Sequence, residues 1–399
     1  MTGAAMMFWL SAAFVAYVYA GYPAALHVWV WLRRRRPHSA FRNPQYGVSI
    51  VIAARNEGAR LAARLDNLFG LQFSGRRQVI VVSDGSTDNT LEVLARYSRA
   101  VDVVALPGGG KAVALNAGAA CARHEIIVFA DARQVFARDA LQALVESFDD
   151  PTIGAVTGEL LLDAESELFS NRRMCVDRRT PWGSVRSGAK ERRRFERRRP
   201  LASTITDGVG MYWRYEKHLR RLESSVGSMV GATGAIYAIR RHLWRPLPPN
   251  TILDDVLTPM RVVLSGYRVV FNERARAFDR VPADAEAEAR RKVRTLAGNY
   301  QLLLLEPRLL LPWRNPVWLQ YVSHKLGRLC VPYALLTMFG ASILLASTNV
   351  FYAIALGGQV GFYLLAGYGA VIELRSRPQY RAVGRPLAGA GPPAREVAC

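Results

Sequence analysis

The chain has 399 residues, 50 % of them hydrophobic, which is enough for the core of one large or two ordinary domains. Its 53 Lys and Arg against 32 Asp and Glu give a formal charge of +21, which raises the question of nucleic-acid binding. Its four cysteines have no paired or metal-type spacing, so we expect no disulfides and a reducing compartment; they are Cys121, Cys175, Cys330 and Cys399.

The first apolar segment covers residues 1–32, which include no charged side chain, and four arginines follow it at 33–36. A cleaved signal peptide would need a short apolar core preceded by basic residues, and no basic residue precedes this one. We therefore predict a transmembrane anchor over residues 1–36. Because basic residues flank the cytoplasmic end of a span, the N-terminus is expected outside and the following domain inside a bacterial-type inner or plasma membrane.

From residue 45 to 282 the pattern predicts one α/β domain. Apolar, β-branched runs begin at residues 48, 78, 101 and 125, and segments with helical spacing separate them. This alternation is typical of βαβ units with a mostly parallel sheet, in which ligands bind at the carboxyl ends of the strands. Asp84 and Asp131 directly follow two such runs. One such acid could merely cap a helix, but two on neighbouring strands favour a binding site.

A glycine-rich turn, Gly108 to Lys111, precedes the third helical segment. It lacks the hydroxyl residue of a phosphate-binding P-loop because Ala112 follows Lys111, so a Walker-type NTPase is not expected. A turn that carries Lys111 towards a ligand and a plain connecting turn both remain open.

Much of the excess positive charge lies in one segment, residues 172–199, with twelve Lys or Arg and three acids. Its aromatic side chains are Trp182 and Phe195, so it lacks the interleaved stacking residues of a nucleic-acid surface. We expect a solvated, disordered insertion over 172–207, with attraction to anionic lipid as the alternative. We expect no nucleic-acid partner.

The second half of the domain contains glycines and adjacent acids. Gly231 and Gly234 allow close approach of the backbone, and Asp254 and Asp255 open an amphipathic helix. Acids at a helix N-terminus can simply interact with the helix dipole, at about 0.3–1 kcal/mol each, but two in succession exceed what capping requires.

The remaining sequence predicts further membrane contact. Residues 283–320 form a basic and then apolar amphipathic run typical of a helix in the membrane interface. Residues 326–373 are long and apolar enough for two transmembrane helices. Residues 374–399 are rich in Pro, Gly and Arg, and we expect them to form a disordered tail.

Seven motifs occur in an order that resembles the membrane-integrated family-2 glycosyltransferases, a group with a GT-A fold that includes cellulose, hyaluronan and poly-N-acetylglucosamine synthases. The resemblance covers about residues 47–300 and rests on "VSIVIAARNE", "VVSDGSTDNT", "GKAVALNAG", "VFADA", "GATGAIYAIRR", "ILDDVL" with "SGYRVVF", and "RRKVRTLAG".

The resemblance implies a role for each matching residue. Ala54, Asn56, Glu57 and Asp84 would bind the nucleotide of a sugar donor, expected to be a UDP-sugar, and Lys111 would approach it. Asp131 matches the first acid of the family's D-x-D motif, a ligand of Mg²⁺ or Mn²⁺. Asp255 matches the general base of the T-E-D motif, with Asp254 in place of its Glu, and Arg294 matches the arginine of Q-x-x-R-W. We expect Gly231, Thr233 and Gly234 to contact the acceptor or the transferred sugar.

The chain departs from the family pattern at two motifs. Arg133 replaces the second acid of D-x-D, and we expect it to face the diphosphate or a neighbouring acid, with a side chain turned to solvent as the alternative. Arg291 and Thr295 replace the Gln and Trp of Q-x-x-R-W. The sequence thus predicts an inverting, membrane-anchored glycosyltransferase with a glycan or lipid-linked acceptor. A processive polysaccharide synthase and a non-catalytic membrane scaffold are the alternatives.

Overall fold

The computed structural model describes residues 3–33, 46–163, 204–280 and 285–376. Three parts of the predictions lie outside the described residues: arginines 34–36, the basic segment 172–199 and residues 377–399 of the tail. The chain divides into two compact units, Tyr17–Leu329 and Met1–Ala16 together with Cys330–Cys399.

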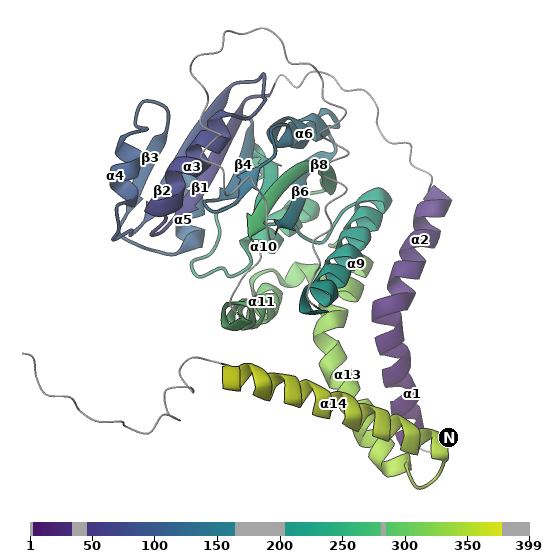
Figure 1. Ribbon diagram of the computed structural model, residues 1–399. Helices are drawn as coiled ribbons and strands as arrows, with labels where there is room; N and C mark the ends of the chain where they lie inside the picture. Colours follow the sequence, from purple (N-terminus) through teal and green to yellow (C-terminus); the bar gives the residue numbers. More distant parts are fainter. Residues whose placement is uncertain (1–2, 34–45, 164–203, 281–284, 377–399) are drawn as a thin grey trace, which may run out of the picture. The chain divides into compact units, whose positions relative to one another are not determined.

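The larger unit contains an eight-stranded mixed sheet with the strand order β3-β2-β1-β4-β7-β6-β8-β5 (Figure 1). Strands β3, β2, β1 and β4 are parallel, and β7 joins β4 and β6 in antiparallel pairings. The strands are β1 (Val48–Ala54), β2 (Arg77–Asp84), β3 (Asp102–Leu106), β4 (Ile126–Asp131), β5 (Val135–Phe136), β6 (Ile153–Asp163), β7 (Ile236–Arg240) and β8 (Arg268–Arg280). The predicted α/β class and the four predicted strands are confirmed.

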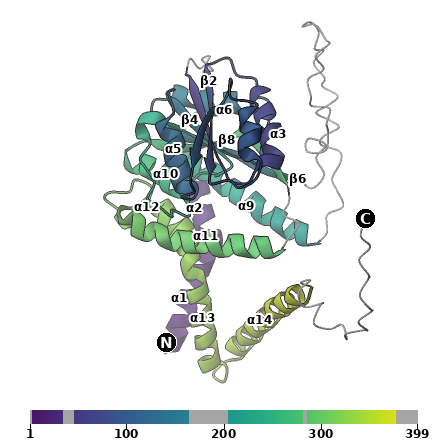
Figure 2. The ribbon, with the colours of Figure 1, turned by 90° about the vertical axis from the view of Figure 1, so that its left-hand side faces the viewer.

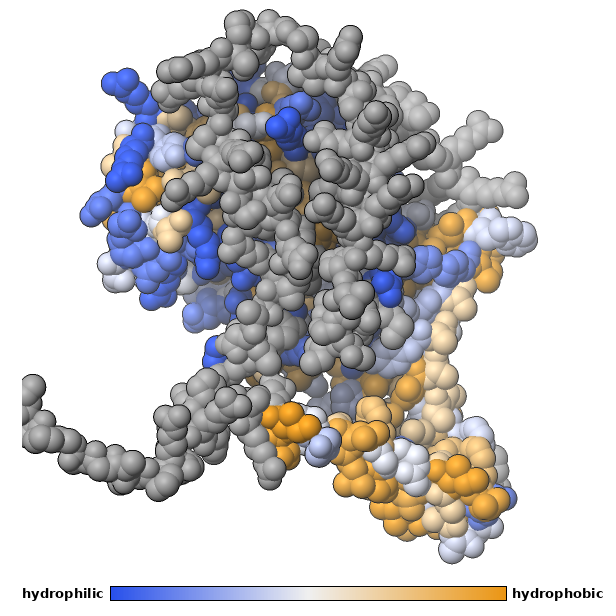
Figure 3. All heavy atoms as spheres, viewed as in Figure 1, coloured by the Kyte–Doolittle hydropathy of each residue, from blue (hydrophilic) through white to orange (hydrophobic). Residues whose placement is uncertain are grey.

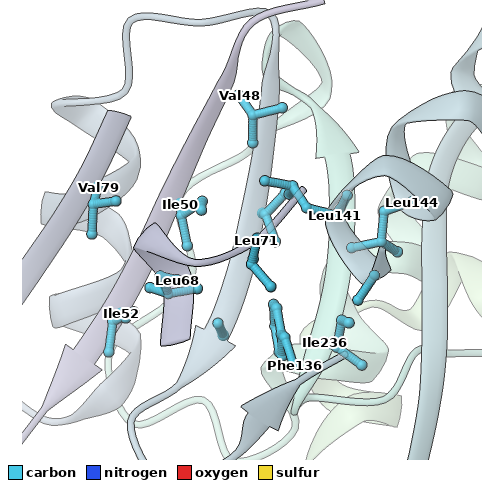
Figure 4. Close-up of a cluster of buried hydrophobic side chains, with 14 of the residues drawn as sticks. Val48, Ile50, Ile52, Leu68, Leu71, Val79, Phe136, Leu141, Leu144 and Ile236 are labelled. Carbon is cyan, nitrogen blue, oxygen red and sulfur yellow. The ribbon is translucent and has the colours of Figure 1, made fainter. Parts of the chain in front are cut away.

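Helices cover both faces of the sheet because its central strands are apolar on both sides. One face packs against α3 (Gly58–Phe69), α4 (Thr90–Ala95) and α6 (Ala140–Glu146), and Figure 4 shows β1 side chains of that core beside Leu68 and Leu141. The other face packs against α5 (Lys111–Ala120) and α10 (Asp254–Leu264). Ile50 and Val51 are fully buried on opposite faces, as strand alternation requires.

Two further helices of this unit, α9 (Thr204–Val226) and α11 (Ala285–Leu305), lie below the sheet in Figures 1 and 2. α9 begins inside the segment predicted as a disordered insertion, so residues 204–207 of that segment are helical. The same unit includes α2 (Tyr22–Arg33), the short α12 (Trp318–Gln320) and two π-helical turns, η1 (Tyr17–Gly21) and η6 (Tyr321–Leu326). Short 3-10 turns are η2 (Ser147–Asp149), η4 (Arg241–Leu243) and η5 (Pro307–Leu310).

Among the residues that the structure describes, three helical segments are long and apolar enough to cross a membrane: Gly3–Leu32, Trp318–Leu345 and Val350–Gly369. The first comprises α1 (Gly3–Ala16), η1 and nearly all of α2, the second α12, η6 and α13 (Gly327–Leu345), and the third most of α14 (Val350–Ser376). The smaller unit exposes many large apolar side chains, including Leu344, Ile354 and Leu365, and its surface is mainly orange in Figure 3. This exposure is what a lipid-facing surface requires.

Candidate active site

The carboxyl ends of β1, β2 and β4 bring the predicted donor residues to one edge of the sheet. These strands are parallel neighbours, with Ala53 in register with Asp131 and Ala54 with Ser83, the residue before Asp84. Acids that are far apart in sequence are therefore placed along one edge by the parallel topology alone.

The turn after β1 is held by hydrogen bonds from the turn after β2. Asn56 has a left-handed backbone (φ 56°), and its Oδ1 accepts a hydrogen bond from the Thr87 amide at 2.8 Å. The Glu57 amide donates to Thr90 Oγ1 at 3.0 Å, and the Gly58 amide donates to Asp88 Oδ2 at 3.0 Å. The predicted nucleotide-binding turn is thus one hydrogen-bonded structure made of two loops. Asp88 stabilises it, although Asp88 was not among the predicted site residues.

Asp84 holds the glycine-rich turn. Its carboxylate accepts hydrogen bonds from the amides of Gly109 at 2.6 Å and Gly110 at 3.0 Å, and its side chain is buried. Gly108 and Gly110 have positive φ angles of 110° and 86°, which favour glycine. Asp84 therefore fixes the backbone that leads directly into Lys111, the first residue of α5.

Lys111 lies between two acids from opposite halves of the domain. Its Nζ is 3.3 Å from Asp131 Oδ1 and 3.4 Å from Asp254 Oδ1. Burial acts to lower the pKa of Lys111, but the neighbouring carboxylates of Asp254, Asp131 and Asp255 outweigh it and raise the pKa above its usual value. Lys111 is therefore a permanent positive charge that links the donor-side acid to the acid pair.

Asp254 and Asp255 begin α10 and differ in environment. Asp254 is 4 % exposed, and burial raises its pKa to about 6, with Asp255 and Asp131 acting in the same direction and Lys111 against it. Asp255 is partly exposed, and among the described residues no hydrogen bond or ion pair holds its carboxylate. Of the two acids, Asp255 is the one whose carboxylate is open to a substrate hydroxyl.

The glycine-rich loop before β7 packs against Asp255. The Ala232 amide donates to the Asp255 carbonyl at 2.7 Å, and a Cβ placed on Gly234 would lie 3.0 Å from Asp255 Oδ2. Gly231 has a φ of 149° and Thr233 is buried. The structure thus brings all three predicted acceptor-side residues, Gly231, Thr233 and Gly234, to the loop beside this acid.

Two arginines of the predicted site are paired with other groups. Arg133 Nε is 3.1 Å from Asp279 Oδ2 on β8, and the Arg133 side chain is 56 % exposed, so it contacts a neighbouring acid and solvent together. Arg294 on α11 donates to the Ile252 carbonyl at 3.4 Å, close to the start of α10. No local pattern in the sequence pointed to Asp279, because its partner is distant in the chain.

The described residues contain no group of three or more His, Cys, Asp or Glu side chains arranged to hold a metal ion. Asp131 is 34 % exposed, and one of its oxygens contacts Lys111. Mg²⁺ is commonly bound by one or two carboxylates and completed by water and substrate phosphates. Asp131 therefore fits a cation that arrives with a diphosphate, and it does not fit a cation held by protein ligands alone.

Comparisons with known proteins show which family and fold the chain resembles. Residues 49–220 match the family described as Glycosyl transferase family 2. Poly-beta-1,6-N-acetyl-D-glucosamine synthases of Staphylococcus aureus and Staphylococcus epidermidis are 24 % identical over 262 residues, which is 65 % of this chain and 56 % of theirs. The chain thus aligns with little more than half the length of these curated relatives.

Among solved structures, a mannosyltransferase from Pyrobaculum calidifontis in complex with GDP-Man and Mn²⁺ superposes with a TM-score of 0.62 at 21 % identity, covering 94 % of each chain. This likeness shows the fold, and the family match covers the strands and turns that form the donor side of the site. Residues 49–220 therefore match a family 2 glycosyltransferase model, and the larger unit has the GT-A fold.

Proposed function

We propose that the protein is a membrane-anchored, inverting glycosyltransferase of the hexosyltransferase type, which moves a sugar from a nucleotide-diphospho-sugar to a glycan or lipid-linked acceptor. The observation that carries this proposal is the contact of Lys111 with both Asp131 and Asp254, beside the open carboxylate of Asp255. This arrangement puts a fixed cation and a free base next to each other, which are the two groups that sugar transfer needs.

On the donor side, the turns around Asn56, Glu57 and Asp84 bind the nucleotide of a UDP-sugar. Lys111 contacts the diphosphate, whose negative charge increases as the bond to the sugar breaks. Asp131 would hold a Mg²⁺ or Mn²⁺ ion, which would supply positive charge to stabilise the leaving diphosphate. Arg133, turned towards Asp279, keeps additional positive charge at the same edge.

On the acceptor side, Asp255 removes the proton from the acceptor hydroxyl as the oxygen attacks the anomeric carbon. A single in-line displacement inverts that carbon and needs no covalent intermediate. Asp254 remains in contact with Lys111. Arg294 lies beside the start of α10, and from there its guanidinium contacts the diphosphate of the donor.

The membrane forms the third part of the proposal. The three candidate spans anchor the chain, and the arginines that follow the first span support a catalytic domain on the cytoplasmic face. On α11, Val293, Leu296 and Leu304 are more than half exposed and recur at helical spacing, with Arg290, Arg291 and Lys292 near them. Such a helix binds at the surface of an anionic bilayer through apolar and electrostatic contacts together. Nucleic acid is not a partner in this proposal.

Single addition is favoured over processive synthesis because of the residues at the Q-x-x-R-W position. Thr295 stands where the synthases place a tryptophan, and its hydroxyl donates to the Arg291 carbonyl within the helix at 2.9 Å. A side chain bonded in this way offers no aromatic surface on which a sugar polymer could stack.

The test is a panel of UDP-, GDP- and dTDP-sugars offered to membranes containing the protein, with released nucleoside diphosphate and labelled product measured. One donor is expected to turn over into short products, and Asp255→Asn is expected to lower the rate about 100-fold or more. Long product ladders would establish the processive alternative. Turnover of no donor, with intact nucleotide binding, would favour the scaffold.

A further inference from the structure

Helix α9 brings an arginine to the acceptor-side loop. Arg220 Nη1 donates to Thr233 Oγ1 at 2.6 Å, and the Thr233 amide donates to Thr157 Oγ1 on β6 at 2.8 Å. Thr233 is therefore held from two sides, once by the sheet and once by α9. The sheet contact fixes the backbone of the loop, and the Arg220 contact fixes its side chain.

The same loop determines where the carboxylate of Asp255 can lie. Ala232 donates to the Asp255 carbonyl, and Gly234 faces its Oδ2 so closely that a single added carbon would be 3.0 Å away. A shift of this loop by a few tenths of an ångström therefore changes the position of Asp255. Displacements of about 1 Å at a reacting group can lower a rate about 100-fold.

On its other side, Arg220 faces Glu216, one helical turn earlier, with 3.8 Å between Nε and Oε1. Glu216 accepts a hydrogen bond from Arg328 at 2.8 Å and lies 3.2 Å from His324 Nε2. His324 belongs to η6 and Arg328 to the start of α13, so both lie within the candidate span Trp318–Leu345. The contacts form an unbroken path from that span to the loop beside Asp255.

This path is buried and strongly charged. Glu216 and His324 are each less than a tenth exposed, and so is Glu223, which accepts from Tyr22 and contacts His324 at 2.7 Å. Burial acts to raise the pKa of Glu216, but His324, Arg328 and Arg220 together hold it well below its usual range. Replacing such a cluster with apolar side chains is often neutral or stabilising, so packing alone does not explain it.

We propose that Arg220 is a positioning residue, which sets the acceptor-side loop and the Asp255 carboxylate from the membrane end of the domain through Glu216. The catalytic half of this inference rests on the proposed function, because it assigns Asp255 the role of base. The structural half, that Arg220 orders the loop, stands independently of any activity.

The test compares Arg220→Met with Arg221→Met in the full-length, membrane-reconstituted protein. Arg221 is the matched control: it is adjacent on α9, but its guanidinium pairs with Glu273 and makes no contact with the loop. With the donor identified by the panel, Arg220→Met is expected to lower kcat 10- to 100-fold while the affinity for the nucleoside diphosphate stays within twofold. Arg220→Lys is expected to recover part of the loss, and Arg221→Met to behave as wild type.

Amide hydrogen exchange provides the readout that needs no activity. Arg220→Met is expected to increase exchange at Ala232 and Ile236, whose amides are bonded within or beside the loop, and to leave the β1 and β4 amides unchanged. Glu216→Gln is expected to give a smaller change of the same kind. Unchanged exchange in Arg220→Met would overturn the inference. A loop that loosens in a protein that turns over no donor would instead count against the proposed function.

Discussion

Replacing Lys111 with methionine removes the cation that contacts both Asp131 and Asp254. At the observed separations of 3.3 and 3.4 Å each attraction is about 5 kcal/mol at an effective dielectric constant of 20. Lys111 and Asp131 are each 34 % exposed, so solvent screens that pair and the net loss is smaller. The loss of catalysis is a separate quantity: one fixed group that meets the developing negative charge of the leaving group is worth about 3 kcal/mol of transition-state stabilisation, which corresponds to about a 100-fold lower kcat/KM.

The assay measures release of nucleoside diphosphate at saturating and limiting donor, with the affinity for the free nucleoside diphosphate measured separately. Lys111→Met is expected to lose both affinity and kcat, because the lysine meets a charge that is present in the bound donor and increases in the transition state. Lys111→Arg is expected to be intermediate, since it keeps the charge but changes the reach. A Lys111→Met enzyme within threefold of wild type would refute the assignment.

The same variant has a pH-dependent stability that can be worked out from Asp254. The pKa of Asp254 in the folded protein, about 6, is above its ordinary value of 3.8, so the folded state binds the proton more tightly. Stability from this group is present below about pH 4 and decreases as the pH rises to about 6. Removal of Lys111 raises that pKa further. Thermal unfolding should therefore show a larger deficit of Lys111→Met at pH 8 than at pH 5, and an equal deficit would contradict the pairing.

Three other outcomes are expected. Donor affinity should increase as the pH is lowered through about 6, because protonation of Asp254 removes a negative charge that competes with the diphosphate for Lys111, and isothermal titration should find this step absent in Asp254→Asn. Arg133→Asp should strengthen Mn²⁺ binding in the presence of the nucleoside diphosphate about tenfold, measured by manganese paramagnetic resonance, because it adds a second carboxylate two residues after Asp131; unchanged binding would remove Arg133 from the site. Leu304→Asp in α11, whose native side chain is 84 % exposed, should leave thermal unfolding of the domain unchanged and should weaken protection of α11 from exchange in anionic vesicles, whereas protection equal to wild type would contradict interface binding.

The donor half of the site could be predicted from the sequence because each of its parts leaves a local signal. A strand that is buried on both faces is an uninterrupted apolar run, and an acid at its end is visible as the first polar residue after that run. Asp84 and Asp131 follow such runs, and parallel pairing then places them along one edge. Helix α10 was visible in the same way, since Asp254 and Asp255 precede a periodic apolar face.

The contacts that connect the halves could not be predicted, because they join residues far apart in the chain. Lys111 meets Asp254, and Arg133 meets Asp279, through pairings decided by sheet order and not by local composition. Helix α9 is a different case. Its buried Leu219, Leu222 and Val226 recur at helical spacing, but the preceding basic segment dominated the composition of that region.

The position of Lys111 links two motifs that look unrelated in the sequence. Asp84 ends β2, and its two carboxylate oxygens accept hydrogen bonds from the amides of Gly109 and Gly110, which directly precede Lys111. If the glycine turn were free, binding of Lys111 to the acids would cost conformational entropy of both the backbone and the side chain. Because Asp84 already fixes the turn, only the side-chain entropy of Lys111 is lost in that contact. Under the proposed function, the acid at the end of β2 therefore supports catalysis through the lysine that it positions.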